Sequence, residues 1–275
     1  MRTTTIMVAS NLLRRLSKRH GIFLATIGLL LFGFQILISA IVANTNIEGA
    51  IQELSGSLPP FIKNFLTEEL ALGIGSRGLI VFAWNHPVVH AMLAAVIMTL
   101  ASRAIAGEIE DGTLEIILAQ PLSRPVYLAA QIIFTFFVLV ALISAMLIGV
   151  RLGLSIYGLQ RVLSWPIFLP VALNLLSLEM AIYGVTLLLS SLWREAGRVV
   201  TITLLFVLIS YLLQVVTRLW PAIQFLQHYT IFEYYSPQRM VLNEGISWGN
   251  IVVLLAVGFA TGGAGWWRFM RRDVP

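Results

Sequence analysis

The sequence contains no cysteine and few charged side chains. Its 275 residues include no Cys, so disulfide bonds and thiolate metal sites are excluded. Charged residues make up 11% of the chain and hydrophobic residues 58%, whereas soluble domains carry about 25% charged and about 45–50% apolar residues. The mean hydropathy is +0.88. A water-soluble fold cannot bury this much apolar surface, so the composition predicts a polytopic membrane protein.

Motifs of several enzyme and metal-binding classes are also missing. The chain has no G-x-x-x-x-G-K-[ST] phosphate-binding loop, no H-E-x-x-H metal motif and no nucleophile elbow. His86 and His90 are spaced to share a helix face, but no cysteine or nearby acidic residue supplies the further ligands that a metal ion needs. We therefore predict no catalytic residue and no metal site, and we place both histidines near the outer membrane interface.

Apolar runs divide the chain into six segments that are long enough to cross a membrane, since about 20 residues span the hydrocarbon core. They predict an all-α fold in which one transmembrane domain covers residues 1–275. Six crossings would leave both termini on the same side of the membrane. The predicted spans are residues 22–43, 79–106, 126–150, 166–190, 199–219 and 250–270.

Residues 1–21 are predicted to form an amphipathic helix that lies on the membrane surface. Apolar side chains recur there at helical spacing, and basic side chains gather on the other side. The alternative is the charged start of a cleaved signal peptide. The apolar run that follows has 22 residues, which is too long for a signal core, so an uncleaved first span is favoured. The basic residues are Arg14, Arg15, Lys18 and Arg19.

Lysine and arginine are unevenly divided between the two faces. The face that carries both termini holds 12 of them, and the opposite face holds 6. The positive-inside rule places the more basic face in the cytoplasm, together with residues 103–125 and 191–198. Residues 220–249 then form an aromatic-rich outer segment. This segment is either an interfacial aromatic belt or a re-entrant set of short helices that caps a central cavity.

An acidic stretch in residues 107–125 separates the second and third predicted spans. Four of the 13 acidic residues fall within eight positions, and apolar residues alternate with them. This pattern predicts a short amphipathic helix with one face toward the membrane domain and an acidic face toward a cytoplasmic partner; the alternative is a solvated loop. Exposed ion pairs contribute little energy, so we expect Ile109, Leu114 and Ile117 to supply much of the contact with that partner.

Few charged side chains lie inside the predicted spans. Glu179 is the only acidic one, and a carboxylate there costs about 2.5–3.5 kcal/mol on insertion scales. We expect it to face a polar cavity or a helix partner, with Asn174 on a neighbouring turn. A substrate-path or proton-relay role and an interhelical hydrogen bond are both open. Gln35 is either a further path residue or a packing contact, and Gly258 and Gly262 would permit close helix packing.

The stretch after the second span resembles the type 2 permease family of ATP-binding-cassette (ABC) transporters. The family pattern R-x-I-x-G-E, G-T-L-E and L-x-x-P-x-S-R occurs here in residues 103–108, 112–115 and 118–124. The basic N-terminal segment, residues 194–198, residues 234–237 and the terminal Arg-Arg-Asp are also similar to the family. The resemblance covers essentially the whole chain and is most specific between Arg103 and Arg124.

This resemblance implies a membrane-spanning permease subunit without enzymatic activity of its own. Two permease copies, a homodimer or a pair with a paralogous permease, would surround a translocation path. They would work with two copies of a separate ATPase subunit that binds ATP and Mg, while the permease itself binds no cofactor and no nucleic acid. We expect an efflux transporter of a prokaryotic plasma (inner) membrane that works by ATP-driven alternating access, with both termini cytoplasmic.

The resemblance also suggests which residues carry the function. The stretch 107–125 would hold a coupling helix that docks in a groove of the ATPase, with secondary contacts from the basic N-terminal residues. The path would be lined by the first, second and fifth spans. The docking residues would be Glu108, Glu110, Asp111, Thr113, Leu114, Glu115 and Arg124. The secondary contacts would come from Arg14, Arg15, Lys18 and Arg19. The path residues would be Glu179, Asn174 and Gln35.

Two other function classes are weaker interpretations of the same sequence. An ion- or proton-coupled secondary transporter would use Glu179 as the carrier, but this acid is isolated and no discontinuous-helix signature accompanies it. An integral-membrane enzyme would need a paired acid and base, which the sequence does not offer. The identity of the substrate does not follow from the sequence.

Overall fold

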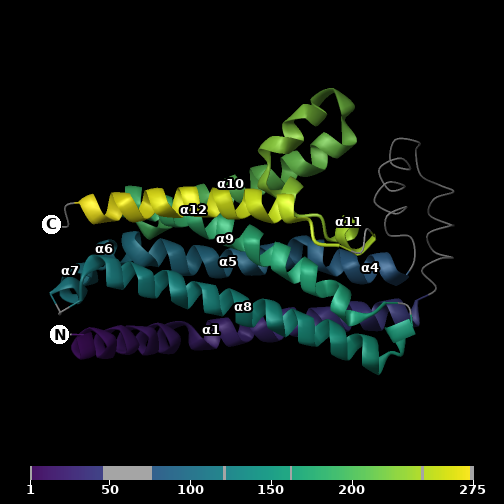
Figure 1. The fold of residues 1–275 in the computed structure, drawn as a ribbon, viewed down its shortest axis with the longest axis horizontal. Coiled ribbons are helices and arrows are strands. Elements are labelled where there is room, and N and C mark those ends of the chain that lie inside the picture. Colours follow the sequence, from purple (N-terminus) through teal and green to yellow (C-terminus); the bar gives the residue numbers. More distant parts are fainter. Residues whose placement is uncertain (1, 46–75, 120–121, 162, 243–244, 273–275) are drawn as a thin grey trace.

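The computed structural model describes residues 2–45, 76–119, 122–161, 163–242 and 245–272, and every regular element in these ranges is helical. The elements form an elongated bundle with both termini at the same end (Figure 1). The long helices are α1 (Arg2–Asn44), α5 (Pro87–Ser102), α8 (Arg124–Ile156), α9 (Phe168–Leu192), α10 (Ala196–Leu219) and α12 (Trp248–Arg271). Shorter elements are α4 (Ser76–Phe82), η1 (Ala83–Asn85), η2 (Arg103–Gly107), α6 (Glu108–Glu110), α7 (Thr113–Leu118), η3 (Leu159–Arg161), η4 (Trp165–Ile167), η5 (Pro221–Tyr229), η6 (Ile231–Tyr234) and α11 (Pro237–Leu242).

Within the described residues, six helical segments are long and apolar enough to cross a membrane, which confirms the predicted all-α, six-span fold. A helix satisfies most of its backbone hydrogen bonds within itself, as the bilayer interior requires. Several begin or end a few residues away from the predicted positions. The six segments are Leu12–Asn44, Arg77–Glu110, Arg124–Ile156, Trp165–Leu192, Ala196–Leu219 and Trp248–Arg271.

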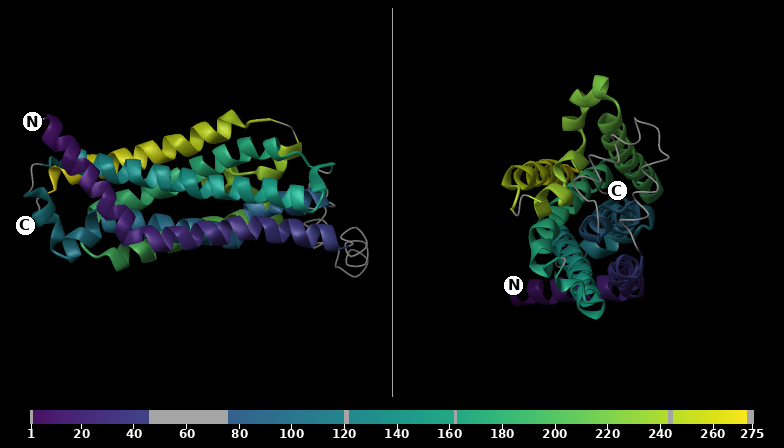
Figure 2. Two further views of the ribbon diagram at one scale, coloured as in Figure 1. Left: turned by 90° about the horizontal axis from the view of Figure 1, so that it is seen from below. Right: turned by 90° about the vertical axis from the view of Figure 1, so that its right-hand side faces the viewer.

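The first helix differs from the prediction of a separate surface helix over residues 1–21. Helix α1 runs without interruption for 43 residues, and it bends so that its N-terminal part leaves the direction of the bundle (Figure 2). No proline lies in this helix to break it. A helix of this length measures about 65 Å, roughly twice the hydrocarbon thickness, so its N-terminal part extends beyond the span.

The second span is interrupted at its outer end. His86 adopts an extended backbone, and its Nδ1 accepts a hydrogen bond from the backbone N–H of Val88 at 3.2 Å. Pro87 then begins α5, a position where its fixed φ and missing N–H are compatible with a helix. The helical path continues from α5 through η2 and α6 as far as Glu110. This continuity carries the span directly into the acidic stretch.

Close contacts between small residues join the helices in pairs. A Cβ atom added to Gly184 of α9 would overlap the carbonyl oxygen of Gly258 in α12. A Cβ at Gly149 of α8 would lie 2.6 Å from the carbonyl oxygen of Phe32 in α1. Small residues allow such backbone approach between membrane helices. Helix α9 therefore packs on α12, and α8 packs on α1.

The outer segment after α10 folds as the short elements η5, η6 and α11. Phe232 and Tyr235 are buried, whereas Phe225 and Tyr229 are exposed. The Tyr235 hydroxyl donates a hydrogen bond to the carbonyl oxygen of Trp84 at 2.9 Å. Burial raises the pKa of Tyr235 well above its usual value, and the nearby Glu179 carboxyl acts in the same direction. The segment thus has a buried side on the bundle and an exposed aromatic side.

Candidate functional site

A π-helix, η2, connects the second span to the acidic stretch. Such a turn displaces backbone groups from the α-helical pattern and is frequent at functional sites. The hydroxyl of Ser190 in α9 donates to the carbonyl of Ser102 and accepts from the N–H of Ala106, both at 3.0 Å. The hydroxyl of Tyr127 in α8 donates to the carbonyl of Ala104 at 2.7 Å. The third and fourth spans therefore hold the π-helix in place.

The first acid of the stretch, Glu108, points into the protein. Its side chain is 5% exposed and lies 2.7 Å from a guanidinium nitrogen of Arg19 on α1. The hydroxyl of Thr113 donates to the other carboxylate oxygen. Asp111 lies 3.4 Å from Arg19 and 3.5 Å from Arg103. These contacts tie α6 to the first helix by charge-assisted hydrogen bonds, which are stronger than neutral ones.

The second acid, Glu110, contacts the start of the fifth span. Its Oε2 accepts a hydrogen bond from the backbone N–H of Ala196 at 2.8 Å. Ala196 is the first residue of α10, and the preceding Glu195 makes no side-chain cap bond. The first N–H groups of a helix lack partners within it and carry a partial positive charge, so a carboxylate is favourable there. Glu110 therefore couples α6 directly to α10.

A break at Gly112 separates α6 from α7. Gly112 has φ +67°, a backbone conformation that glycine adopts without the steric penalty of a side chain. Gly107, in contrast, is helical, with φ −69°. The sharp turn is therefore at Gly112, whereas at Gly107 the helical backbone continues into α6.

Helix α7 divides its side chains between the protein and the surface. Leu114 and Ile117 are 1% and 5% exposed, and both belong to the protein's own core. Glu115 is exposed, and Ile116 is 66% exposed. Leu114 and Ile117, which the sequence predicts to contact a partner, here anchor α7 to the bundle, and they do so together because residues three apart lie on the same side of a helix. Ile116, which the sequence reading did not single out, is the outward apolar residue.

Arginines close the same end of the bundle. Arg124, the first residue of α8, donates from Nη1 to the carbonyl of Arg272 at 2.7 Å. Arg272 donates to the carbonyls of Ser191 and Trp193 at 2.8 and 3.0 Å. Partial burial lowers the pKa of Arg272, and the neighbouring positive charges of two other arginines add to this effect. These bonds join the start of α8 and the end of α9 to the residue that follows α12.

The residues from Arg103 to Arg124 therefore form one junction, which we call the coupling junction. Its described side chains and backbone groups bond to α1, α8, α9, α10 and the residue that follows α12. The predicted docking residues Glu108, Glu110, Leu114 and Arg124 make contacts inside the protein in this structure. The outward surface of α7 consists of Glu115 and Ile116, with Asp111 and Thr113 at its edge.

The basic N-terminal residues differ among themselves. Arg14, Arg15 and Lys18 are exposed. The Arg19 side chain is 31% exposed and pairs with Glu108 and Asp111. Arg19 therefore has a role inside the coupling junction, while the other three face outward.

Glu179 has a partner that the sequence reading did not identify. Its Oε1 lies 3.8 Å from Nδ1 of His90 on α5, and both side chains are buried. The other ring nitrogen of His90, Nε2, lies 3.3 Å from the amide oxygen of Asn85. The edges of Phe232 and Tyr235 approach the same imidazole ring. His90 is thus a buried residue and the partner of Glu179 on another span.

The three predicted path residues lie at three different helix contacts. Asn174 donates to the carbonyl of Tyr234 at 3.1 Å, and Gln35 lies on α1 against Gly149 of α8. Glu179 faces His90 as described above. All three are at most 1% exposed, so in this structure none of them borders an open path, and they are not brought together.

A separate apolar pocket of about 300 Å³ lies between the second and fifth spans. Its walls come from α5 and α10, and His90 lies at one side of it. The residues that line it include Ala91, Ala94, Met98, Val207, Leu208 and Phe232. Within the described ranges, no group of three or more His, Asp or Glu residues is arranged to hold a metal ion.

Comparison with known proteins gave one finding. A family model described as "ABC-2 family transporter protein" matches residues 38–274. The matched part contains the whole coupling junction and the second to sixth spans. No curated protein and no solved structure matches the chain.

Proposed function

The chain belongs to the ABC-2 family of transporter proteins, and from this premise we propose that it is the membrane subunit through which a separate ATPase drives export. Members of this family are membrane components of transporters, so the chain is a permease subunit and not the catalytic ATPase subunit. The observation that carries the proposal is the arrangement of the coupling junction. Its outward residues lie on α7, and its inward residues are bonded to the other long helices.

The proposed docking surface is small and has mixed chemistry. Glu115 offers a carboxylate that can orient an arginine or lysine of the ATPase. Ile116 is 66% exposed, and burying such a side chain contributes about 1.5–3 kcal/mol. Ile116 thus supplies affinity and Glu115 supplies orientation. The exposed Arg14, Arg15 and Lys18 are available for secondary contacts on the same side.

Movement of α7 would pass into the membrane along the bonds of the coupling junction. When two ATPase subunits close on ATP and Mg, α7 is displaced with the groove that holds it. Glu110 transmits this displacement to α10, and Ser190 and Tyr127 transmit it to α9 and α8. Glu108 transmits it to α1 through Arg19. A rigid set of short contacts is suited to this role, because each one joins the junction to a different helix.

We further propose a homodimeric arrangement around the translocation path. The apolar pocket between α5 and α10 supports a path that borders the second and fifth spans. Its lining suits an apolar substrate or the apolar part of one. The complete burial of Glu179 against His90 supports a packing role for this acid rather than the carrier role of a proton-coupled transporter. The excess of basic residues at the end that holds both termini supports a cytoplasmic position for that end in a prokaryotic plasma membrane.

The proposal is tested by binding of the purified permease to the ATPase encoded beside it. Glu115→Arg combined with Ile116→Arg should weaken binding at least tenfold, since one charge is reversed and the apolar contact is lost. Gln224→Arg, an exposed substitution in η5, is the control and should bind like the wild type. If the wild-type permease does not bind the ATPase, or the double variant binds equally well, the proposal fails.

A further inference from the structure

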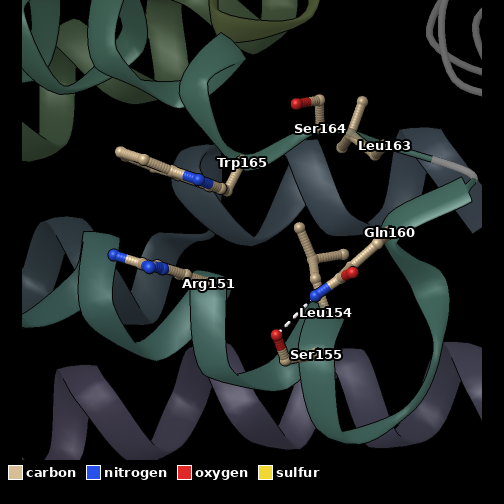
Figure 3. Close-up of a pocket in the computed structure, with 7 residues that line it drawn as sticks. All are labelled: Arg151, Leu154, Ser155, Gln160, Leu163, Ser164 and Trp165. Atoms are coloured by element: carbon tan, nitrogen blue, oxygen red, sulfur yellow. Dashed lines mark hydrogen bonds between the residues drawn. The ribbon is translucent and has the colours of Figure 1, made fainter.

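A polar pocket lies at the end of the bundle opposite both termini, between the end of α8 and the start of α9 (Figure 3). Its volume is about 410 Å³. It has no part in the coupling junction or in the apolar pocket between α5 and α10. The residues that line it are Arg151, Leu154, Ser155, Gln160, Leu163, Ser164 and Trp165.

Arg151 is the charged residue of this pocket; it is exposed, and it lies near one boundary of the membrane. It lies about 16 Å from the midpoint of α8 along the helix axis, and the hydrocarbon core reaches about 15 Å from its own midpoint. With α8 centred in the bilayer, Arg151 is at the boundary between hydrocarbon and headgroups. At this depth a long arginine side chain can reach the headgroups and their water. No carboxylate of the described residues pairs with Arg151.

The surroundings of Arg151 fix its position without neutralising it. Its guanidinium carbon lies 5.3 Å from the ring centre of Trp165, a cation–π geometry that leaves the N–H donors at the rim of the guanidinium plane free for other partners. Tryptophan prefers the membrane–water interface, which agrees with the depth estimated for Arg151. Figure 3 shows the two side chains stacked on one side of the pocket.

The rest of the pocket adds polar groups but no negative charge. The amide nitrogen of Gln160 donates to the hydroxyl of Ser155, and Ser164 makes no side-chain bond to the helix that it precedes. Leu154 and Leu163 are each 1% exposed and form an apolar floor. One arginine, two hydroxyls and an amide make a site that complements a phosphate group, because arginine offers several N–H donors in a fixed plane.

We propose that this pocket binds the phosphate headgroup of an anionic phospholipid from the leaflet opposite the termini. Exposed apolar side chains on the same two helices, Ile148, Leu152 and Leu169, offer surfaces for the acyl chains. The depth of Arg151 and these apolar neighbours favour a lipid over a soluble phosphate. The proposal concerns a lipid site on the permease and does not depend on how the permease is energised.

Native mass spectrometry of the full chain, released from nanodiscs that contain phosphatidylglycerol and phosphatidylcholine, tests the proposal. Wild-type protein should retain phosphatidylglycerol in preference to phosphatidylcholine. Arg151→Gln should reduce this preference roughly tenfold, the size expected for losing hydrogen bonds from a charged group. Arg161→Gln, an exposed arginine of η3 outside the pocket, should keep the wild-type preference.

Three outcomes would overturn the proposal. The wild type shows no preference for the anionic lipid, Arg151→Gln and Arg161→Gln behave alike, or glycerol phosphate added at the same concentration displaces the lipid, which would indicate a site for a small soluble anion. Thermal unfolding of each variant establishes that it is folded. If Arg151→Gln does not fold, Trp165→Leu takes its place, since it removes the stacking contact and should also lower the preference.

Discussion

At the scale of single residues, the contact between Glu179 and His90 is the main feature of the membrane interior. Both side chains are buried, and their facing atoms are 3.8 Å apart. Burying an ionisable group is costly unless another polar group compensates for it. The sequence predicted that Glu179 needs a partner, because it is the only acid in a predicted span. It did not identify His90, because that pairing depends on the packing of α5 against α9.

This contact leads to a stability prediction. His90→Leu should lower the free energy of unfolding by about 1–3 kcal/mol, the usual cost of leaving a buried polar group without its partner. The combined change His90→Leu and Glu179→Leu should recover much of that loss, because no polar group is then stranded. Thermal unfolding of the purified protein in a fixed detergent measures the effect.

His86→Leu is the matched control for this prediction. His86 precedes His90 by one helical turn and lies on the boundary of α5, where it contacts the rings of Phe34 and Phe82. Its replacement removes one cap hydrogen bond of α5 and strands no buried acid, so it should cost less than that of His90, about 0.5–1 kcal/mol. Equal stability of His90→Leu and the wild type would show that Glu179 does not depend on this imidazole.

At the scale of elements, the coupling junction shows what a local pattern predicts and what it misses. Alternating carboxylates and apolar residues predicted a short helix between the second and third spans, and α7 occupies this stretch. The contacts of the buried Glu108 and the exposed Glu110 with other helices were missed. Their partners, Arg19 and Ala196, are 89 and 86 residues away in the sequence, so no local pattern reports them. The spacing of Leu114 and Ile117 could have predicted the exposure of Ile116, since residues three apart share one side of the helix and Ile116 then lies on the other.

Close packing between α9 and α12 gives a prediction for a helix pair. Gly184→Ala places a methyl group against the carbonyl of Gly258, so the two helices must separate or bend. Overpacking of this kind costs about 1–3 kcal/mol. Thermal unfolding in detergent should show a clear decrease in stability.

Gly263→Ala is the control within α12. A Cβ atom there meets no heavy atom within 4 Å, and replacing glycine by alanine in a helix interior stabilises it by about 1 kcal/mol. The two substitutions should therefore change stability in opposite directions. A Gly184→Ala variant that is as stable as the wild type would contradict the packing described for α9 and α12.

At the scale of the whole molecule, the fold was the most predictable property. Each membrane helix must satisfy the hydrogen-bonding groups of its own backbone, so a long apolar run is enough to predict a helical span. The continuity of α1 was less predictable, because a change from a basic amphipathic pattern to an apolar one does not by itself break a helix. The lateral order of the spans was not predictable, since it depends on side-chain fit between helices.

The orientation of the molecule in the membrane is a further prediction. The chain has no cysteine, so single cysteines can be placed freely. Ala119→Cys, after α7, should react with a membrane-impermeant maleimide only after the cells are permeabilised. Arg161→Cys, at the opposite end, should react in intact cells. The reverse labelling pattern would show that the positive-inside rule fails for this chain and that α7 does not face the cytoplasm.

The central claim is that the coupling junction transmits movement of α7 to the membrane helices. A substitution of Glu110 tests this role separately from docking. Glu110→Ala removes the bond to the N-terminus of α10 but leaves Glu115 and Ile116 unchanged. Losing such a helix-terminal contact costs about 0.5–2 kcal/mol, so the protein should remain folded. Glu195→Ala, which removes an exposed acid that pairs with Arg198 three residues further on, is the matched control.

The most direct measurement compares ATPase binding and permease-stimulated ATP hydrolysis for these two variants. Glu110→Ala should bind the ATPase with a Kd within about twofold of the wild type. Its stimulated hydrolysis should fall at least fivefold, while Glu195→Ala keeps both properties. Stimulated hydrolysis by Glu110→Ala at the wild-type rate would contradict the account, because α7 would then act on the membrane helices without this bond.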